Sequence, residues 1–167
     1  IYFLNQQRSL LALQKAEKMK KQAFADRYPY GIFSCIRTMG HIYKSRGNFD
    51  LSAQYYQEAL DYMLKNMPDQ DPSQLYSSLA EYYRNTQKDY ATALDYCEKA
   101  LKSAKTERNI AQAMIEKCLI LFRQGRIDEF NDCYKEAVQM ADRCKLSANV
   151  SLLIAHISKN ILDKQYE

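Results

Sequence analysis

The sequence has 167 residues, enough for one domain or a run of small repeats to bury about 70% of the surface that its unfolded form exposes. Its 4 glycines and 3 prolines exclude collagen-like, low-complexity and turn-rich all-β chains. The net charge of +4 falls well short of the concentrated positive charge of a DNA-binding domain, and no apolar run approaches the roughly 20 residues that cross a bilayer.

Apolar residues recur at spacings of three and four along most of the chain, which predicts helices. Pro68 and Pro72 mark the clearest break, and Ser73 is placed to cap the helix that follows. Gly47 and Gly125 fall where a residue with positive φ would end a helix. In chain order, the predicted elements are a partial repeat at 1–25, helix pairs at 30–66, 73–104 and 107–144, and a terminal helix with a truncated repeat at 147–167.

The three helix pairs share one pattern of small and large residues. Gly40, Ala80 and Cys118 occupy equivalent positions on the first helices, 40 and 38 residues apart. The equivalent alanines on the second helices, 41 and 37 residues apart, are Ala59, Ala100 and Ala137. A small residue beside a large one lets neighbouring helices approach closely, so the pattern predicts repeated helix packing.

Tyrosine is unusually frequent, at 14 residues with no tryptophan. We interpret the tyrosines as packing residues beside the small positions, with a platform for stacked bases or sugars as the alternative. The turn inside the second pair is one residue longer than in the first, because Tyr43 and Phe49 are six apart and Tyr83 and Tyr90 are seven apart.

These residues resemble tetratricopeptide repeats, whose first helix carries Leu-Gly and then Tyr, and whose second helix carries alanines and an aromatic residue. The first pair matches nearly throughout, the second has Cys97 at an aromatic position, and the third is degenerate, with Lys117 and Cys118 for Leu-Gly and Phe130 for Ala. The resemblance covers residues 10–165. It implies an all-α fold, a right-handed solenoid of antiparallel helix pairs with about seven to eight helices.

The resemblance also implies a protein- or peptide-binding scaffold. Long, tyrosine-rich repeats are similar to sensor regions of bacterial signalling proteins, so we expect the sensing or interaction segment of a larger signal-transduction protein (a histidine kinase, as in two-component sensors) or transcription regulator. The alternatives are a nucleic-acid-binding helical repeat and an oligomerisation module. We expect no enzyme and no cofactor, since none of the common catalytic or nucleotide-binding motifs occurs.

Proteins of this family line their concave side with the first helices of the repeats. The corresponding positions here predict a groove with five cations and one acid, ending in an apolar stretch. Such a groove suits an extended peptide with acidic and apolar side chains, or a carboxylate end. The predicted groove residues are Arg37, His41, Lys44, Ser77, Glu81, Arg84, Asn85, Leu119, Phe122, Arg123, His156 and Lys159.

The five cysteines are scattered without a Cys-x-x-Cys motif, so we expect no metal site. An odd number of unpaired thiols favours a reducing compartment such as the cytoplasm, whereas a sensor region of a kinase would favour the periplasm. The localisation stays open on these grounds. The sequence starts at Ile1 without an initiator methionine, and we expect it to be a piece of a longer protein.

Overall fold

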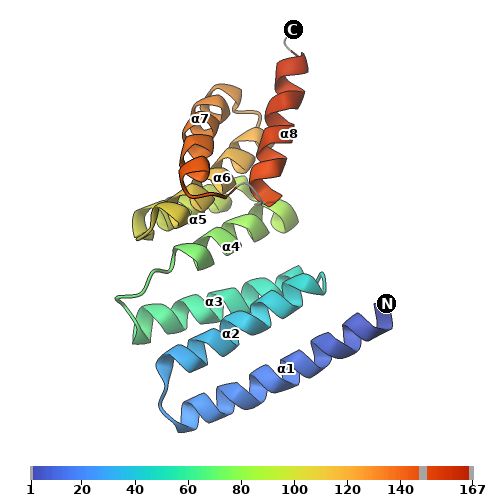
Figure 1. The fold of residues 1–167 in the computed structure, drawn as a ribbon, viewed down its shortest axis with the longest axis vertical. Helices are drawn as coiled ribbons and strands as arrows, with labels where there is room; N and C mark the ends of the chain where they lie inside the picture. The colour runs from blue at the N-terminus through green and yellow to red at the C-terminus, as the bar shows by residue number, and fades with distance from the viewer. Residues whose placement is uncertain (1, 147–149, 166–167) are drawn as a thin grey trace. The chain divides into compact units, whose positions relative to one another are not determined.

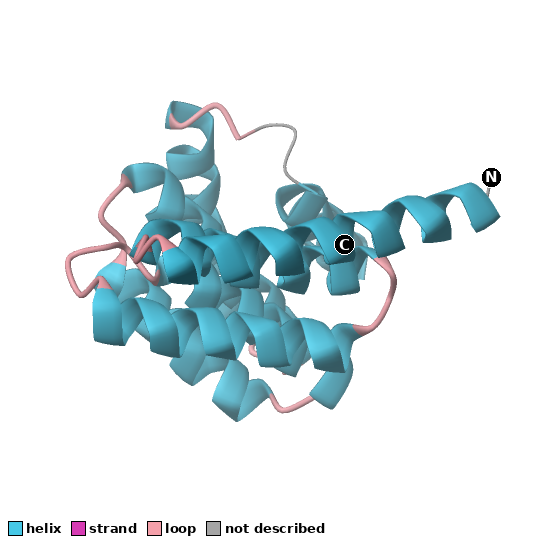
Figure 2. Cartoon of the chain, turned by 90° about the horizontal axis from the view of Figure 1, so that it is seen from below, coloured by secondary structure: helices cyan, strands magenta, loops and turns pink. Residues whose placement is uncertain are grey.

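The computed structural model describes residues 2–146 and 150–165, and every element within these ranges is a helix (Figures 1 and 2). The chain forms two compact units, Ile1–Leu75 and Tyr76–Glu167, and each is described here by itself. Eight α-helices and one short π-helix make up the described part, so the all-α prediction is confirmed. None of these helices has both the length and the apolar character that spanning a membrane requires.

Local signals explain where the helices of the first unit begin and end. Gly47 takes a φ of 76° and ends one helix, and the side chain of Asn48 accepts a hydrogen bond from the Leu51 N–H at the start of the next, at 3.2 Å. Arg27, with a φ of 51°, and Pro29 make the earlier turn. The helices of this unit are α1 (Tyr2–Ala25), α2 (Pro29–Ser45) and α3 (Phe49–Asn66).

The core of the first unit lies where α2 packs against α1 and α3. Gly40 on α2 is completely covered by Tyr56 of α3: a Cβ added at Gly40 would lie 2.7 Å from the Tyr56 ring. In the second unit the equivalent residues are Ala80 and Cys97, both fully buried. Alanine thus replaces glycine in the pair where cysteine replaces the facing tyrosine. This exchange of volume confirms the packing interpretation of the repeated pattern.

The linker before the next helix corrects one expectation. The helix does begin at Ser73, but Ser73 does not cap it, because its hydroxyl is buried and has no hydrogen-bond partner among the described residues. Instead the carboxylate of Asp71 accepts a hydrogen bond from the Ser73 N–H at 2.9 Å. Aspartate is as good a capping residue as serine, so the helix start is stabilised by the residue two positions earlier.

Helices also make up the second unit, and two of its helix starts are capped by side chains. Asp89 accepts from the Thr92 N–H at 3.1 Å, and Thr106 accepts from the Asn109 N–H at 3.2 Å. Gly125, with a φ of 72°, lies in the turn of the third pair as predicted. The elements are α4 (Ser73–Tyr82), the π-helix η1 (Tyr83–Gln87), α5 (Tyr90–Ser103), α6 (Glu107–Arg123), α7 (Ile127–Arg143) and α8 (Val150–Gln165).

The π-helix accounts for the extra residue in the second turn. In the first unit the Asn48 N–H bonds the carbonyl of Tyr43, five positions earlier, at 3.0 Å. In the second unit the Asp89 N–H bonds the carbonyl of Tyr83, six positions earlier, at 3.1 Å. The inserted residue is thus absorbed as one wide helical turn, and such π-turns occur frequently at functional sites.

Helix α6 is the central helix of the second unit, with α5, α7 and α8 packed against it. It buries residues around most of its circumference, including Ile115, Cys118, Ile120 and Leu121. Helix α8 contacts α6 and α7, so the expected terminal helix does dock on the preceding pair. It extends to Gln165.

Candidate functional site

Three of the predicted groove residues lie on one face of α2. Arg37, His41 and Lys44 are four and three positions apart, which places them on the same side of a helix. The guanidinium of Arg37 lies 5.1 Å from the ring centre of Phe33, so the aromatic ring supports its position. Helix α2 contains no aspartate or glutamate, and this face, the α2 cationic face, carries two permanent cations, Arg37 and Lys44.

His41 is fixed by a neighbour from α3. Its Nδ1 atom lies 2.9 Å from the hydroxyl oxygen of Tyr56, and the two rings meet edge to face at 5.3 Å. Burial lowers the pKa of His41, and the nearby charges of Arg37 and Lys44 lower it further. The imidazole is therefore held in its neutral form near pH ~7, with the two permanent cations beside it.

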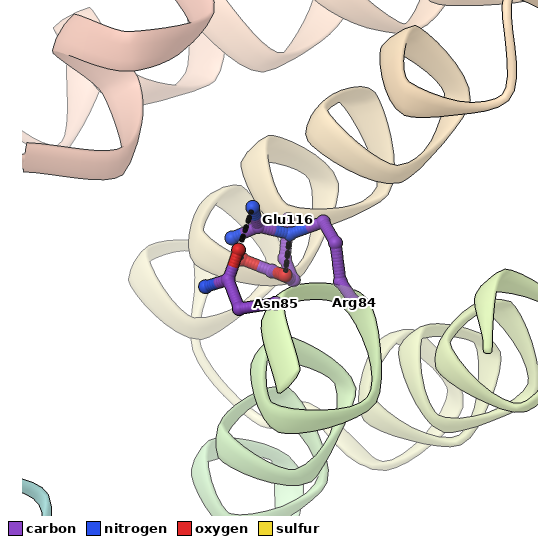
Figure 3. A network of polar contacts seen from close by, with 3 residues as sticks. All are labelled: Arg84, Asn85 and Glu116. Atoms are coloured by element: carbon purple, nitrogen blue, oxygen red, sulfur yellow. Dashed lines mark hydrogen bonds and ion pairs between the residues drawn. The ribbon is translucent and has the colours of Figure 1, made fainter. Parts of the chain in front are cut away.

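Arg84 does not have the exposed position that the sequence predicted, because only 5% of its surface is accessible. Its Nε and Nη2 atoms donate to the two carboxylate oxygens of Glu116 on α6, at 2.6 and 3.1 Å. Its Nη1 donates to the side-chain oxygen of Asn85 at 2.7 Å (Figure 3). Arg84 lies in the π-turn. Its guanidinium forms a buried ion pair with Glu116 through two hydrogen bonds, and this pair joins the turn to α6.

The predicted apolar end of the groove is also mostly covered. Leu119 is 2% exposed and belongs to the core, so the prediction that it lies exposed in a groove is wrong. Phe122 is half-buried and packs against Phe130, with ring centres 5.6 Å apart. Because α6 is surrounded by α5, α7 and α8, its apolar residues are used for packing within the unit.

The remaining predicted residues of the second unit have varied surroundings. His156 on α8 lies 2.6 Å from the hydroxyl oxygen of Tyr134, and Lys159 forms an ion pair with Asp163. Arg123 at the end of α6 is exposed. Two further predicted residues, Ser77 and Glu81, are half-buried on α4. That the ten predicted residues other than Arg84 and Leu119 line one groove stays a prediction, since three of them belong to the first unit and seven to the second.

Stacked tyrosines recur at equivalent positions in the first two helix pairs. Tyr43 stacks on Tyr55 at 5.3 Å, and Tyr83 stacks on Tyr96 at 5.4 Å. Each stack joins the first helix of its pair to the second. These four tyrosines therefore act as packing residues between the two helices of each pair.

The third pair replaces this stack with two smaller residues, Leu121 and Cys133. A cavity of about 360 Å³ lies there, and both residues line it. Its other lining residues come from α5, α6 and α7: Leu101, Met114, Lys117, Glu129, Asp132 and Glu136. Inside the cavity wall, the Sγ atom of Cys118 lies 2.8 Å from that of Cys133.

The sequence analysis missed Glu116 and the cavity. Glu116 follows the apolar residues Met114 and Ile115 on α6, and a charged residue inside a buried helix indicates a buried partner. The cavity had a visible signal as well: aligning the repeats puts Leu121 and Cys133 where the other pairs have tyrosine. Neither signal identifies the residue in contact. Glu116 contacts Arg84, 32 positions away, and Cys133 contacts Cys118, 15 positions away.

Residues 32–106 match the family model described as tetratricopeptide repeat. The match spans α2 to α5, which contain the first two of the three helix pairs, and it confirms the resemblance there. No curated protein matches the chain. Residues 32–106 are thus tetratricopeptide repeats in an all-helical fold, and such repeats generally mediate protein–protein interaction.

Proposed function

We propose that this chain binds an extended, acidic and apolar segment of a partner protein through the α2 cationic face. The observation that carries the proposal is the charge of this face: Arg37, His41 and Lys44 share one side of a helix that has no acidic residue. A guanidinium supported by an aromatic ring is well placed to bind a carboxylate with two hydrogen bonds.

His41 adds a neutral donor and acceptor between the two permanent cations. With Nδ1 directed at the Tyr56 hydroxyl, Nε2 is the ring nitrogen left to meet a ligand. Binding of this kind requires no catalysis, and a binding rather than an enzymatic role is part of the proposal. We further propose that the chain is the sensing or interaction segment of a larger bacterial signal-transduction or transcription-regulatory protein, supported by the resemblance of its long, tyrosine-rich repeats to such regions.

Fluorescence anisotropy tests the binding surface. The probe is a fluorescein-labelled peptide that repeats Glu-Leu-Asp-Phe, and the comparison probe has lysine at each acidic position. We expect the acidic probe alone to bind, and Arg37→Glu to weaken it about tenfold, which corresponds to about 1.4 kcal/mol. Arg37→Lys keeps the charge and loses the two-point geometry, so its effect should be smaller.

The matched control is Lys65→Glu, which makes the same charge reversal at an exposed residue at the end of α3. Equal weakening by Arg37→Glu and Lys65→Glu would mean that only net charge matters, and the proposed face would be rejected. A single-stranded oligonucleotide in the same assay addresses the nucleic-acid alternative. If it binds more tightly than the acidic peptide and its affinity falls steeply with salt, that alternative replaces the proposal.

A further inference from the structure

The third helix pair contains two cysteines in contact, one on each helix. Cys118 on α6 is fully buried, and Cys133 on α7 is half-buried and lines the 360 Å³ cavity. Their Sγ atoms are 2.8 Å apart, and Cys118 donates its S–H to Cys133. The Cys133 thiol in turn donates its S–H to the carbonyl oxygen of Met114 at 3.5 Å.

We propose that Cys133 and Cys118 form a peroxide-reactive modification site, in which Cys133 is the attacking thiol and Cys118 the thiol that closes the disulfide. The site is independent of the α2 cationic face and of any peptide bound there. It exists because the third repeat has Leu121 and Cys133 where the other repeats stack two tyrosines, which leaves an opening beside the sulfur.

Access and charge assign the two roles. The cavity is far larger than the roughly 30 Å³ share of a water molecule, so a small peroxide reaches Cys133, whereas Cys118 has no exposed surface. The S–H donated by Cys118 lowers the pKa of Cys133, and the ammonium of Lys117 lowers it further. Burial and the carboxylate of Glu136 oppose this, and two more acids of α7, Glu129 and Asp132, line the same cavity.

The same hydrogen bond keeps Cys118 protonated. Its pKa is raised because its S–H is donated to Cys133 and because it is buried, so Cys118 is a poor first nucleophile. It is nevertheless already in contact with the sulfur that reacts first. The two-cysteine arrangement thus provides one accessible thiol of lowered pKa and one protected thiol beside it.

The chemistry balances with a hydroperoxide as the oxidant. The Cys133 thiol releases its proton, and the thiolate attacks one peroxide oxygen. The O–O bond breaks, which gives the sulfenic acid of Cys133, and the leaving hydroxide takes up the proton that Cys133 released to become water. The Cys118 sulfur then attacks the Cys133 sulfur, the S–O bond breaks, and the oxygen leaves as water with the Cys118 proton. Two thiols lose two electrons to form the disulfide, and one hydrogen peroxide is reduced to two waters.

The distance favours a disulfide over a bridging metal ion. Two thiolates on a tetrahedral zinc, each about 2.3 Å from the metal, lie about 3.8 Å apart. The two sulfurs lie about 1 Å closer than that, at 2.8 Å. They must approach by only about 0.8 Å to reach the bond length of a disulfide.

Peptide mapping of the intact, reduced chain tests the proposal. After a stoichiometric dose of hydrogen peroxide, N-ethylmaleimide blocks the remaining thiols and trypsin cuts the chain. Trypsin separates the pair, because Lys117 and Arg123 bound the peptide with Cys118, and Arg126 and Lys135 bound the one with Cys133. We expect a cross-linked product of these two peptides, lighter than their sum by two hydrogen atoms.

Variants then separate the two roles. Cys118→Ser should leave Cys133 as a sulfenic acid that dimedone traps, and Cys133→Ser should leave Cys118 reduced. Cys144→Ser is the matched control, since Cys144 is half-buried at the end of α7, and it should leave the cross-link unchanged.

Three results would overturn the inference. The first is a pair that stays reduced while Cys144 is oxidised. The second is a cross-link of Cys133 to Cys97, a buried cysteine whose pKa is raised by burial and then by the charges of Glu116 and Cys133. The third is dimedone labelling of Cys118 in place of Cys133. Peptide mapping of the chain without substitutions shows whether the Cys118–Cys133 cross-link forms, even where a variant fails to fold.

Discussion

Removing the carboxylate of Glu116 should be among the most damaging single changes in the second unit. Glu116→Ala leaves Arg84 with a permanent charge that is 5% exposed and removes two of the three hydrogen bonds that its guanidinium donates to Glu116 and Asn85. Water does not replace those acceptors at such low exposure. The expected result is a large loss in the free energy of unfolding, without any loss of helix propensity, since alanine is the best helix former.

The magnitude follows from the two hydrogen bonds. Each buried donor left without an acceptor costs about 1–3 kcal/mol, so the Nε and Nη2 donors of Arg84 together cost about 2–6 kcal/mol. Breaking a buried ion pair by removing one partner costs about 3–5 kcal/mol in general, which agrees. Replacing both partners, in the double variant Arg84→Met with Glu116→Leu, should restore most of the loss, because no buried charge then remains.

Urea denaturation followed by far-ultraviolet circular dichroism measures these changes, since the chain has no tryptophan. Glu129→Ala is the matched control in the same unit: Glu129 also binds an arginine, Arg126, with two hydrogen bonds, but its side chain is 57% exposed. We expect little change from this control, since exposed pairs contribute little. The reasoning is refuted if Glu116→Ala and Glu129→Ala lose the same stability, or if the double variant is less stable than Glu116→Ala.

Three further predictions concern the first unit. Gly40→Ala should destabilise the chain by about 1–2 kcal/mol, since overpacking against Tyr56 exceeds the gain in helix propensity. In a Tyr56→Cys background the same change should stabilise the chain, because the ring is gone. Urea titrations of the unchanged chain, the two single variants and the double variant measure both effects. Gly47→Ala should cost about 1 kcal/mol because its φ is 76°, and a loss as large in Gly47→Asn would contradict the conformational reason. Because the pKa of His41 is lowered in the folded chain, the unfolded chain binds a proton at this imidazole more readily. Stability should therefore fall as the pH drops below about 6.5. Thermal melts of His41→Gln should show a smaller loss of stability over the same pH range.

Much of the fold could be predicted because its signals are local. A glycine at position 47 or 125 can take positive φ whatever surrounds it, and Thr106 caps the helix that starts one residue later. The extra residue between Tyr83 and Tyr90 was also visible, although its form as a π-turn was not. Ser73 shows the limit of such signals, since Asp71 supplies the hydrogen bond to this helix start and the serine hydroxyl is buried.

The order of residues by itself therefore determined the helices, their turns and the tetratricopeptide pattern, since each depends on neighbours within a few positions. Which side chains are exposed depended on the tertiary structure. Arg84 and Lys44 are equivalent in the repeat, yet Arg84 is buried because α6 brings Glu116 to it across 32 positions. Cys118 and Cys133 likewise meet only when α6 and α7 pack together, because a contact between distant residues is set by helix packing and not by local spacing.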